Sequence, residues 1–103
     1  MKRRVVFHPA AQKDVDQIYD WIADQAGEET ARRYTGRVRD YCAGMDLFPE
    51  RGSRRDDLRP SLRLVGFERR ITIAFSVTDE TVVILRLLYG GRDVEGALGG
   101  KTG

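Results

Sequence analysis

The side chains of this chain that could do chemistry are mostly arginines. Of its 18 lysines and arginines, only Lys2, Lys13 and Lys101 are lysines. The planar guanidinium group of arginine can hold a carboxylate or a phosphate through two parallel hydrogen bonds. A codon preference for arginine explains the composition equally well. The arginines therefore indicate an anionic partner and do not by themselves indicate a reaction.

Four residues are candidates for contacts with such a partner. Arg59, Arg63 and Arg86 precede or lie within predicted strands, and they could converge on one open sheet face to clamp a phosphate or a carboxylate. Arg86 is favoured because it interrupts an apolar strand, so it must project from the less covered face or find a partner. Trp21 is an anchor candidate because indole rings concentrate at interfaces, although the edge of the core suits it as well.

The sequence does not contain the residues that metal binding, nucleotide binding or nucleophilic catalysis would need. One histidine and one cysteine cannot supply the usual four ligands of zinc. Gly90-Gly91 has neither the spacing nor the following lysine of a phosphate-binding loop. His8 is expected to cap a helix, and Cys42 lies in an apolar helix stripe, as a small core residue would. The sequence predicts no catalytic residue, no metal site and no cofactor.

Charge and cysteine content indicate a cytoplasmic chain with a charged partner. Residues 12–30 carry one cation and six acids, whereas residues 31–70 carry eleven arginines and six acids. Such an uneven distribution of charge suits nucleic acid or an acidic polypeptide as the binding partner better than a membrane. The single cysteine cannot form an internal disulfide, and the chain shows neither a signal peptide nor an apolar run long enough for a membrane span.

The apolar pattern predicts a strand, two helices and three strands. Pro9 suits the first turn of a helix, Gly27 separates the two helices, and Pro49 ends the second one. The second helix has an apolar stripe that runs from Ala31 to Phe48. A mobile, charged loop is expected over Pro49 to Arg59. The predicted strands are Arg4 to Phe7, Ser61 to Phe67, Arg69 to Val77 and Thr81 to Tyr89, the last two forming a hairpin.

These elements predict an α+β fold, with an antiparallel helical hairpin packed on a mostly antiparallel sheet. The strand from Val82 to Tyr89 is apolar on both faces except at Arg86, which is typical of a central strand. A last helical turn is expected over Arg92 to Glu95. Residues 1–97 are expected to form one domain, and the glycine-rich residues 98–103 a flexible tail.

The order of elements resembles the RelE/ParE superfamily of bacterial type II toxins. The segments DLRPSLRLVGFERRITIAF and VVILRLLYGGRDVE are similar to the ParE branch, as is the opening FHPAAQKDVDQIYDWIA. The last-strand motif of that branch, an ILRVLHGRRD-like run, is matched by Ile84 to Asp93, with Tyr89 where a histidine is common. The resemblance covers residues 4–97 and adds Tyr89 to the candidate partner-binding residues, which also include Arg92 at the end of the last predicted strand.

The resemblance implies a non-enzymatic toxin that inhibits DNA gyrase by binding and is neutralised by a cognate ParD-like antitoxin. Such antitoxins join a DNA-binding domain to a segment that folds against the toxin. Contact with DNA is therefore expected only through the antitoxin, and no contact with a membrane is expected.

Two alternatives stay open. A RelE-like, ribosome-dependent ribonuclease needs groups that move protons and cations that hold the phosphate. The segment after Arg92, DVEGALGGKTG, has no tyrosine or histidine, and Tyr89 with an ordinary pKa near 10 would be a poor base, so this alternative ranks second. A degenerate toxin that only binds its antitoxin is the third possibility.

Overall fold

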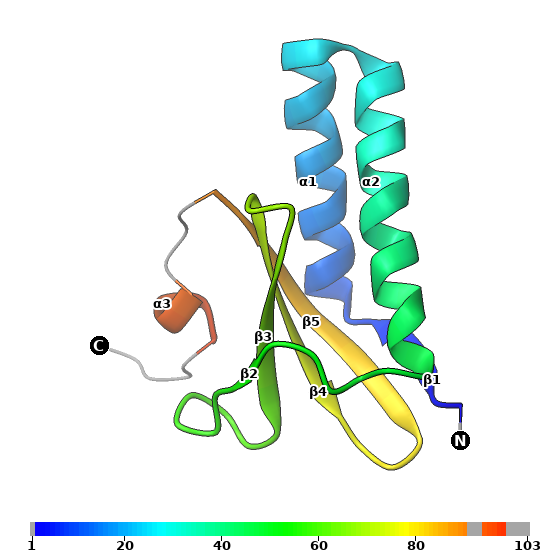
Figure 1. The fold of residues 1–103 in the computed structure, drawn as a ribbon. Helices are drawn as coiled ribbons and strands as arrows, with labels where there is room; N and C mark the ends of the chain where they lie inside the picture. Colours follow the sequence, from blue (N-terminus) through cyan, green and yellow to red (C-terminus); the bar gives the residue numbers. More distant parts are fainter. Residues whose placement is uncertain (1, 91–93, 99–103) are drawn as a thin grey trace.

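The computed structural model describes residues 2–90 and 94–98, and Figure 1 shows their arrangement. A helical hairpin covers one face of a five-stranded sheet, and a short helix lies on the other. The elements are β1 (Arg4–Phe7), α1 (Pro9–Ala26), α2 (Glu28–Ala43), the 3-10 turn η1 (Gly44–Asp46), β2 (Ser53–Arg54), β3 (Leu62–Phe67), β4 (Ile71–Val77), β5 (Thr81–Tyr89) and α3 (Val94–Leu98).

The sheet has the strand order β1-β5-β4-β3-β2, with β1 parallel to β5 and every other pair antiparallel. The predicted α+β fold with a mostly antiparallel sheet is confirmed, and β5 is a central strand as its two apolar faces indicated. The predicted hairpin between β4 and β5 is also present. The two-residue β2, inside the segment predicted to be a loop, is a strand that the sequence did not predict.

Local signals explain where the helical hairpin begins and turns. The side chain of His8 caps α1, because its Nδ1 accepts a hydrogen bond from the backbone N–H of Ala10 at 3.0 Å. Pro9 occupies the first turn, where its missing N–H has no cost. Gly27, with a φ of 97°, joins the two helices in a conformation that other residues rarely adopt. The capping role expected for His8 is confirmed.

The apolar stripe of α2 is shorter than predicted. The α-helix ends at Ala43, and the chain then tightens into η1, so the spacing of 3.6 residues is lost before Phe48. Met45 is fully buried, whereas Phe48 is 68% exposed and Leu47 is 56% exposed. The prediction that Phe48 belongs to the core stripe is therefore wrong.

A second apolar cluster lies on the sheet face opposite the helical hairpin. Leu98 of α3 is 1% exposed and packs with Leu62, Ala74 and Leu88. The prediction that a flexible tail begins at residue 98 is wrong for Leu98, because this sheet face presents leucines that a terminal helix can cover. Residues 99–103 lie outside the described part of the chain. A last helical turn was expected over Arg92 to Glu95. Arg92 and Asp93 lie outside the described residues, and the helix α3 begins at Val94 and extends beyond the predicted end to Leu98.

We predict that Leu98→Ala lowers the free energy of unfolding by about 2 kcal/mol, because it removes a buried side chain and leaves space over Leu88. Urea unfolding followed by circular dichroism measures this loss. Leu47→Ala is the matched control, because the same atoms are removed from an exposed site, and its effect should stay within about 0.5 kcal/mol. Equal effects of the two substitutions would contradict the packing of α3 on the sheet.

Candidate functional site

Strand β5 is paired with β1 along only part of its length. The parallel ladder runs from Arg4 opposite Thr81 to Phe7 opposite Ile84. The chain then leaves the sheet to enter α1, and the N–H of His8 donates the last bond, to the carbonyl of Ile84 at 2.9 Å. An irregularity in the ladder with β4 follows at this point of β5. From Leu85 onward, the outer edge of β5 has no neighbouring strand in the described part of the chain.

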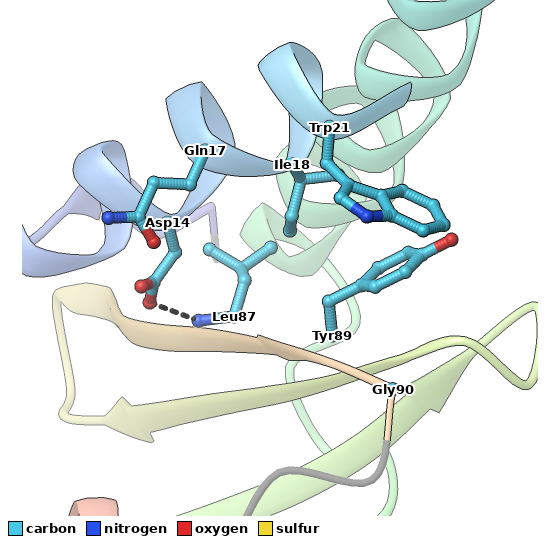
Figure 2. A pocket seen from close by; sticks show the side chains of 7 residues that line it. All are labelled: Asp14, Gln17, Ile18, Trp21, Leu87, Tyr89 and Gly90. Atoms are coloured by element: carbon cyan, nitrogen blue, oxygen red, sulfur yellow. Dashed lines mark hydrogen bonds between the residues drawn. The ribbon is translucent and has the colours of Figure 1, made fainter. Parts of the chain in front are cut away.

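The carboxylate of Asp14, on α1, takes the place of a strand at this edge. Its Oδ2 accepts the backbone N–H of Leu87 at 2.9 Å and the Nε of Arg86 at 2.7 Å, and its Oδ1 accepts Nη2 of Arg86 at 3.0 Å. Figure 2 shows the carboxylate pointing at the backbone nitrogen of Leu87. The Asp14 side chain is only 6% exposed. A buried carboxylate of this kind requires both the cation and the hydrogen bonds.

Asp14 is the site residue that our sequence analysis missed. It lies between Ala11 and Ile18 on the buried side of α1, where an unpaired charge would be costly. The sequence does contain a signal for this pair: an acidic residue lies on an apolar helix stripe, and an arginine lies inside an apolar strand. The expectation that Arg86 finds a partner is confirmed. The hydrogen bonds with Asp14 raise the pKa of the Arg86 guanidinium, although partial burial acts in the opposite direction.

Two of the predicted site residues, Trp21 and Tyr89, lie together farther along the same helix and strand. Their ring centroids are 5.2 Å apart and the rings are inclined by 52°, and Trp21 is 51% exposed. The pair borders a cavity of about 530 Å³ between α1 and β5. Figure 2 shows its lining residues, which are Asp14, Gln17, Ile18, Trp21, Leu87, Tyr89 and Gly90.

A second cavity, of about 430 Å³, also borders Trp21 and Tyr89. Arg37 and Glu68 form one wall and are joined by two hydrogen bonds of 2.9 Å. Arg70 lies at the turn between β3 and β4. The buried hydroxyl of Tyr34 has no hydrogen-bond partner among the described residues, and burial is the main reason that the pKa of this phenol is raised. Trp21 and Tyr89 thus form an aromatic surface with a hollow next to it on each side.

The structure separates the three arginines that were predicted to converge. Arg59 and Arg86 border one cavity of about 230 Å³, together with His8 and Leu98. Arg63 stands opposite Phe75 in the ladder, on the sheet face covered by the helical hairpin, and its Nε donates to the carbonyl of Arg51 at 3.0 Å. The predicted convergence of Arg59, Arg63 and Arg86 is therefore wrong, because strand alternation places Arg63 on the other face.

The remaining candidates give no sign of metal or thiol chemistry. Within residues 2–90 and 94–98 no three histidine, cysteine, aspartate or glutamate side chains are grouped as metal ligands. Burial raises the pKa of the Cys42 thiol to about 12, so this group stays protonated near neutral pH, as a core residue.

Residues 2–90 and 94–98 contain no helix with the length and apolar character that a bilayer span requires. Asp16, Asp20 and Asp24 lie on the exposed side of α1.

The sequence matches a protein-family model over residues 5–94, and that model is described as the ParE toxin of type II toxin-antitoxin system, parDE. Toxin ParE3 of Caulobacter vibrioides is 29% identical over 99 residues, which cover 96% of this chain and 98% of the relative. Toxin ParE1 of Mycobacterium tuberculosis is 28% identical over 96 residues, which cover 92% and 97%.

A solved structure titled as a chromosomal ParDE TA system from P. aeruginosa has the same fold. The TM-score is 0.75 at 22% sequence identity, and the superposed region covers 86% of this chain and 97% of that chain. This likeness agrees with the arrangement of helical hairpin and sheet described above.

We predict that Asp14→Asn lowers the free energy of unfolding by about 2 kcal/mol, because the Arg86 guanidinium loses its counter-charge. Asp14→Ala should cost about 1 kcal/mol more, since the N–H of Leu87 then loses its acceptor as well. Asp16→Asn, on the exposed side of the same helix, is the control and should change stability by less than about 0.5 kcal/mol. Three equally stable variants in urea unfolding would show that the carboxylate does not hold β5.

Proposed function

Since this chain belongs to the family of ParE toxins of type II toxin-antitoxin systems, we propose that it inhibits DNA gyrase by binding and is neutralised by a ParD-like antitoxin. The family match over residues 5–94 is the observation that carries the proposal. The solved relative named as a ParDE system supports an antitoxin as the partner. The toxin acts in the cytoplasm, where both partners would be found.

The described site favours binding over catalysis. Its main features are an open strand edge, an aromatic surface and arginines, which are the components of protein recognition. Two nitrogens of Arg86 are already engaged by Asp14, and Nδ1 of His8 is engaged by the helix cap. A ribonuclease would need groups that are available to hold a phosphate or to move a proton, and these atoms of Arg86 and His8 are already engaged. We therefore propose a toxin without catalytic residues and without a cofactor.

Charge pairing within the toxin narrows the surface that remains for an anionic partner. Several arginines of the basic segment are paired with acids of the same chain, among them Arg32 and Arg33 with Glu29 and Arg54 with Asp56. Arg59, Arg69 and Arg70 have no ion pair among the described residues. These three are therefore positioned to meet acidic side chains of an antitoxin.

The proposed contact residues follow from this geometry. Trp21 and Tyr89 supply aromatic surface, and Arg59 and Arg63 supply guanidinium groups. Arg92, which lies outside the described residues, is retained from the sequence alone. Arg86 acts on binding through its ion pair with Asp14, so it is a positioning residue.

We predict that the purified toxin inhibits supercoiling by DNA gyrase or traps cleaved plasmid with it, and that an excess of a cognate ParD-like antitoxin reverses this. A plasmid supercoiling assay measures both effects, and circular dichroism confirms that the toxin is folded. No effect at any concentration of folded toxin would contradict gyrase as the target.

Two results would support the alternatives to this proposal. Codon-positioned cuts in ribosome-bound mRNA after induction would indicate a ribonuclease. Normal growth on expression without antitoxin would indicate a degenerate toxin that only binds its antitoxin.

A further inference from the structure

We propose that the cavity of about 430 Å³ near the Gly27 end of the helical hairpin is a binding site for a small organic anion that carries a planar ring. Both helices of the hairpin, the turn between β3 and β4, and the end of β5 contribute to its lining. The ring lies against Trp21, and the anionic group meets Arg70 and the hydroxyl of Tyr34. This inference goes beyond the proposed function and does not depend on it.

The hydroxyl of Tyr34 is the observation that carries the inference. Tyr34 lines this cavity and is only 7% exposed, and its buried hydroxyl has no hydrogen-bond partner among the described residues. A buried polar group without a partner is costly and uncommon in folded proteins. Burial raises the pKa of this phenol, so the group stays protonated near neutral pH and can donate a hydrogen bond. An acceptor atom of a bound ligand would supply the missing partner.

Arg70 brings an unpaired cation to the same cavity. Its backbone is fixed, because its N–H donates to the carbonyl of Phe67 at 3.0 Å and its own carbonyl accepts the N–H of Gly90 at 2.8 Å. The residue is exposed and has no ion pair among the described residues. A free guanidinium group can hold a carboxylate or a phosphate through two parallel hydrogen bonds. Arg70 is therefore placed to bind the anionic group of a ligand.

The turn that presents Arg70 has an unusual backbone. Glu68 and Arg69 have φ values of 49° and 61°, in the left-handed region that residues other than glycine rarely adopt. Backbone outliers of this kind cluster at functional sites. Two hydrogen bonds of 2.9 Å from Arg37 to Glu68 hold the turn against α2. Because Arg37 neutralises Glu68, Arg70 gives the lining of the cavity a net positive charge, which favours an anion.

Trp21 and Tyr89 supply a flat apolar wall for a planar ring. Their ring centroids are 5.2 Å apart, and Figure 2 shows the two side chains facing each other between α1 and β5. Trp21 is 51% exposed, so a second ring that stacks on the indole removes apolar surface from water. The volume of the cavity falls within the range of about 300 to 1,000 Å³ that is usual for sites of small ligands.

The hydroxyl of Tyr34 is covered in the unbound chain, so a ligand reaches it by displacing side chains at the rim. Arg37 and Glu68 border the cavity, and their side chains are 53% and 39% exposed. An ion pair with this much exposure contributes little to stability. Its side chains can therefore rotate away at small cost, and the backbone of the site need not move.

The test is an NMR titration of the full-length toxin with three pairs of probes. The ring-bearing anions are adenosine 5′-monophosphate and 1-naphthoate, their uncharged analogues are adenosine and 1-naphthamide, and the anions without a ring are inorganic phosphate and acetate. The chain has one tryptophan, so its indole N–H gives a single resonance that reports on the cavity. A ring-bearing anion should shift this resonance with a dissociation constant of about 10 to 100 μM. Its uncharged and ringless counterparts should bind at least about tenfold more weakly.

Each outcome of the titration decides a part of the inference. Binding of only one of the two ring-bearing anions would support the site and would identify its anionic group as a phosphate or a carboxylate. No shift with either of them would overturn the inference. Equal affinity for the uncharged analogues would show that the anion is not recognised, and equal affinity for phosphate or acetate would show that the ring is not. Either result would also overturn it.

A pair of arginine variants locates the bound anion. Arg70→Gln should weaken binding by about tenfold or more, because the two hydrogen bonds of the guanidinium group are lost. Arg69→Gln removes the neighbouring exposed arginine, which does not border the cavity, and should bind as the wild type does. Equal losses of affinity in the two variants would indicate a general effect of charge and would contradict the assignment of Arg70.

Tyr34→Phe separates binding from stability, because it removes only the hydroxyl. We expect the affinity to fall by about fivefold, whereas the free energy of unfolding in urea should stay equal or rise, since an unpartnered buried group is lost. Tyr41→Phe is the matched control, because Tyr41 does not border the cavity, and its affinity should equal that of the wild type. Unchanged affinity of Tyr34→Phe, or a clear loss of its stability, would overturn the inference.

Discussion

The carboxylate of Asp14 is the interaction on which the arrangement of the site depends. It binds the backbone of β5 at Leu87 and the side chain of Arg86, at the point where β1 has left the sheet. Because Asp14 belongs to α1, the same contact fixes the helical hairpin against the strand. Trp21 follows Asp14 by about two helical turns, and Tyr89 follows Leu87 by two residues, so the two rings meet. One ion pair thus positions the aromatic surface.

The same junction explains why β5 is both a central strand and an edge. Its first half lies between β1 and β4, whereas its second half has α1 beside it in place of a strand. A helix cannot satisfy the outward backbone groups of a strand, and Asp14 satisfies only that of Leu87. The recess that results combines polar backbone groups with apolar walls. This combination suits recognition of a polypeptide and agrees with the membership of the chain in the ParE family.

Local patterns predicted most of the fold, and long-range contacts account for what they missed. The alternation of apolar and polar residues and the positions of proline and glycine predicted the bounds of β1, α1 and β3 to β5 closely. The exposed Phe48 was mispredicted because a 3-10 turn interrupts the helical period. Leu98 and Asp14 depend on partners about 10 to 75 residues away in the chain, which no periodicity reveals. At the site, Trp21 and Tyr89 lie in contact beside the free edge of β5, and their role in binding stays a prediction. The position of Arg86 could not be predicted without its partner Asp14.

A double-mutant cycle between Asp14 and Arg86 tests the central claim most directly. The free energies of unfolding of the wild type, Asp14→Asn, Arg86→Gln and the double variant are measured by urea unfolding under identical conditions. If the ion pair holds α1 against β5, the two substitutions should be non-additive, with a coupling energy of about 1 to 3 kcal/mol. Additive effects, within about 0.3 kcal/mol, would contradict the claim that this pair organises the site.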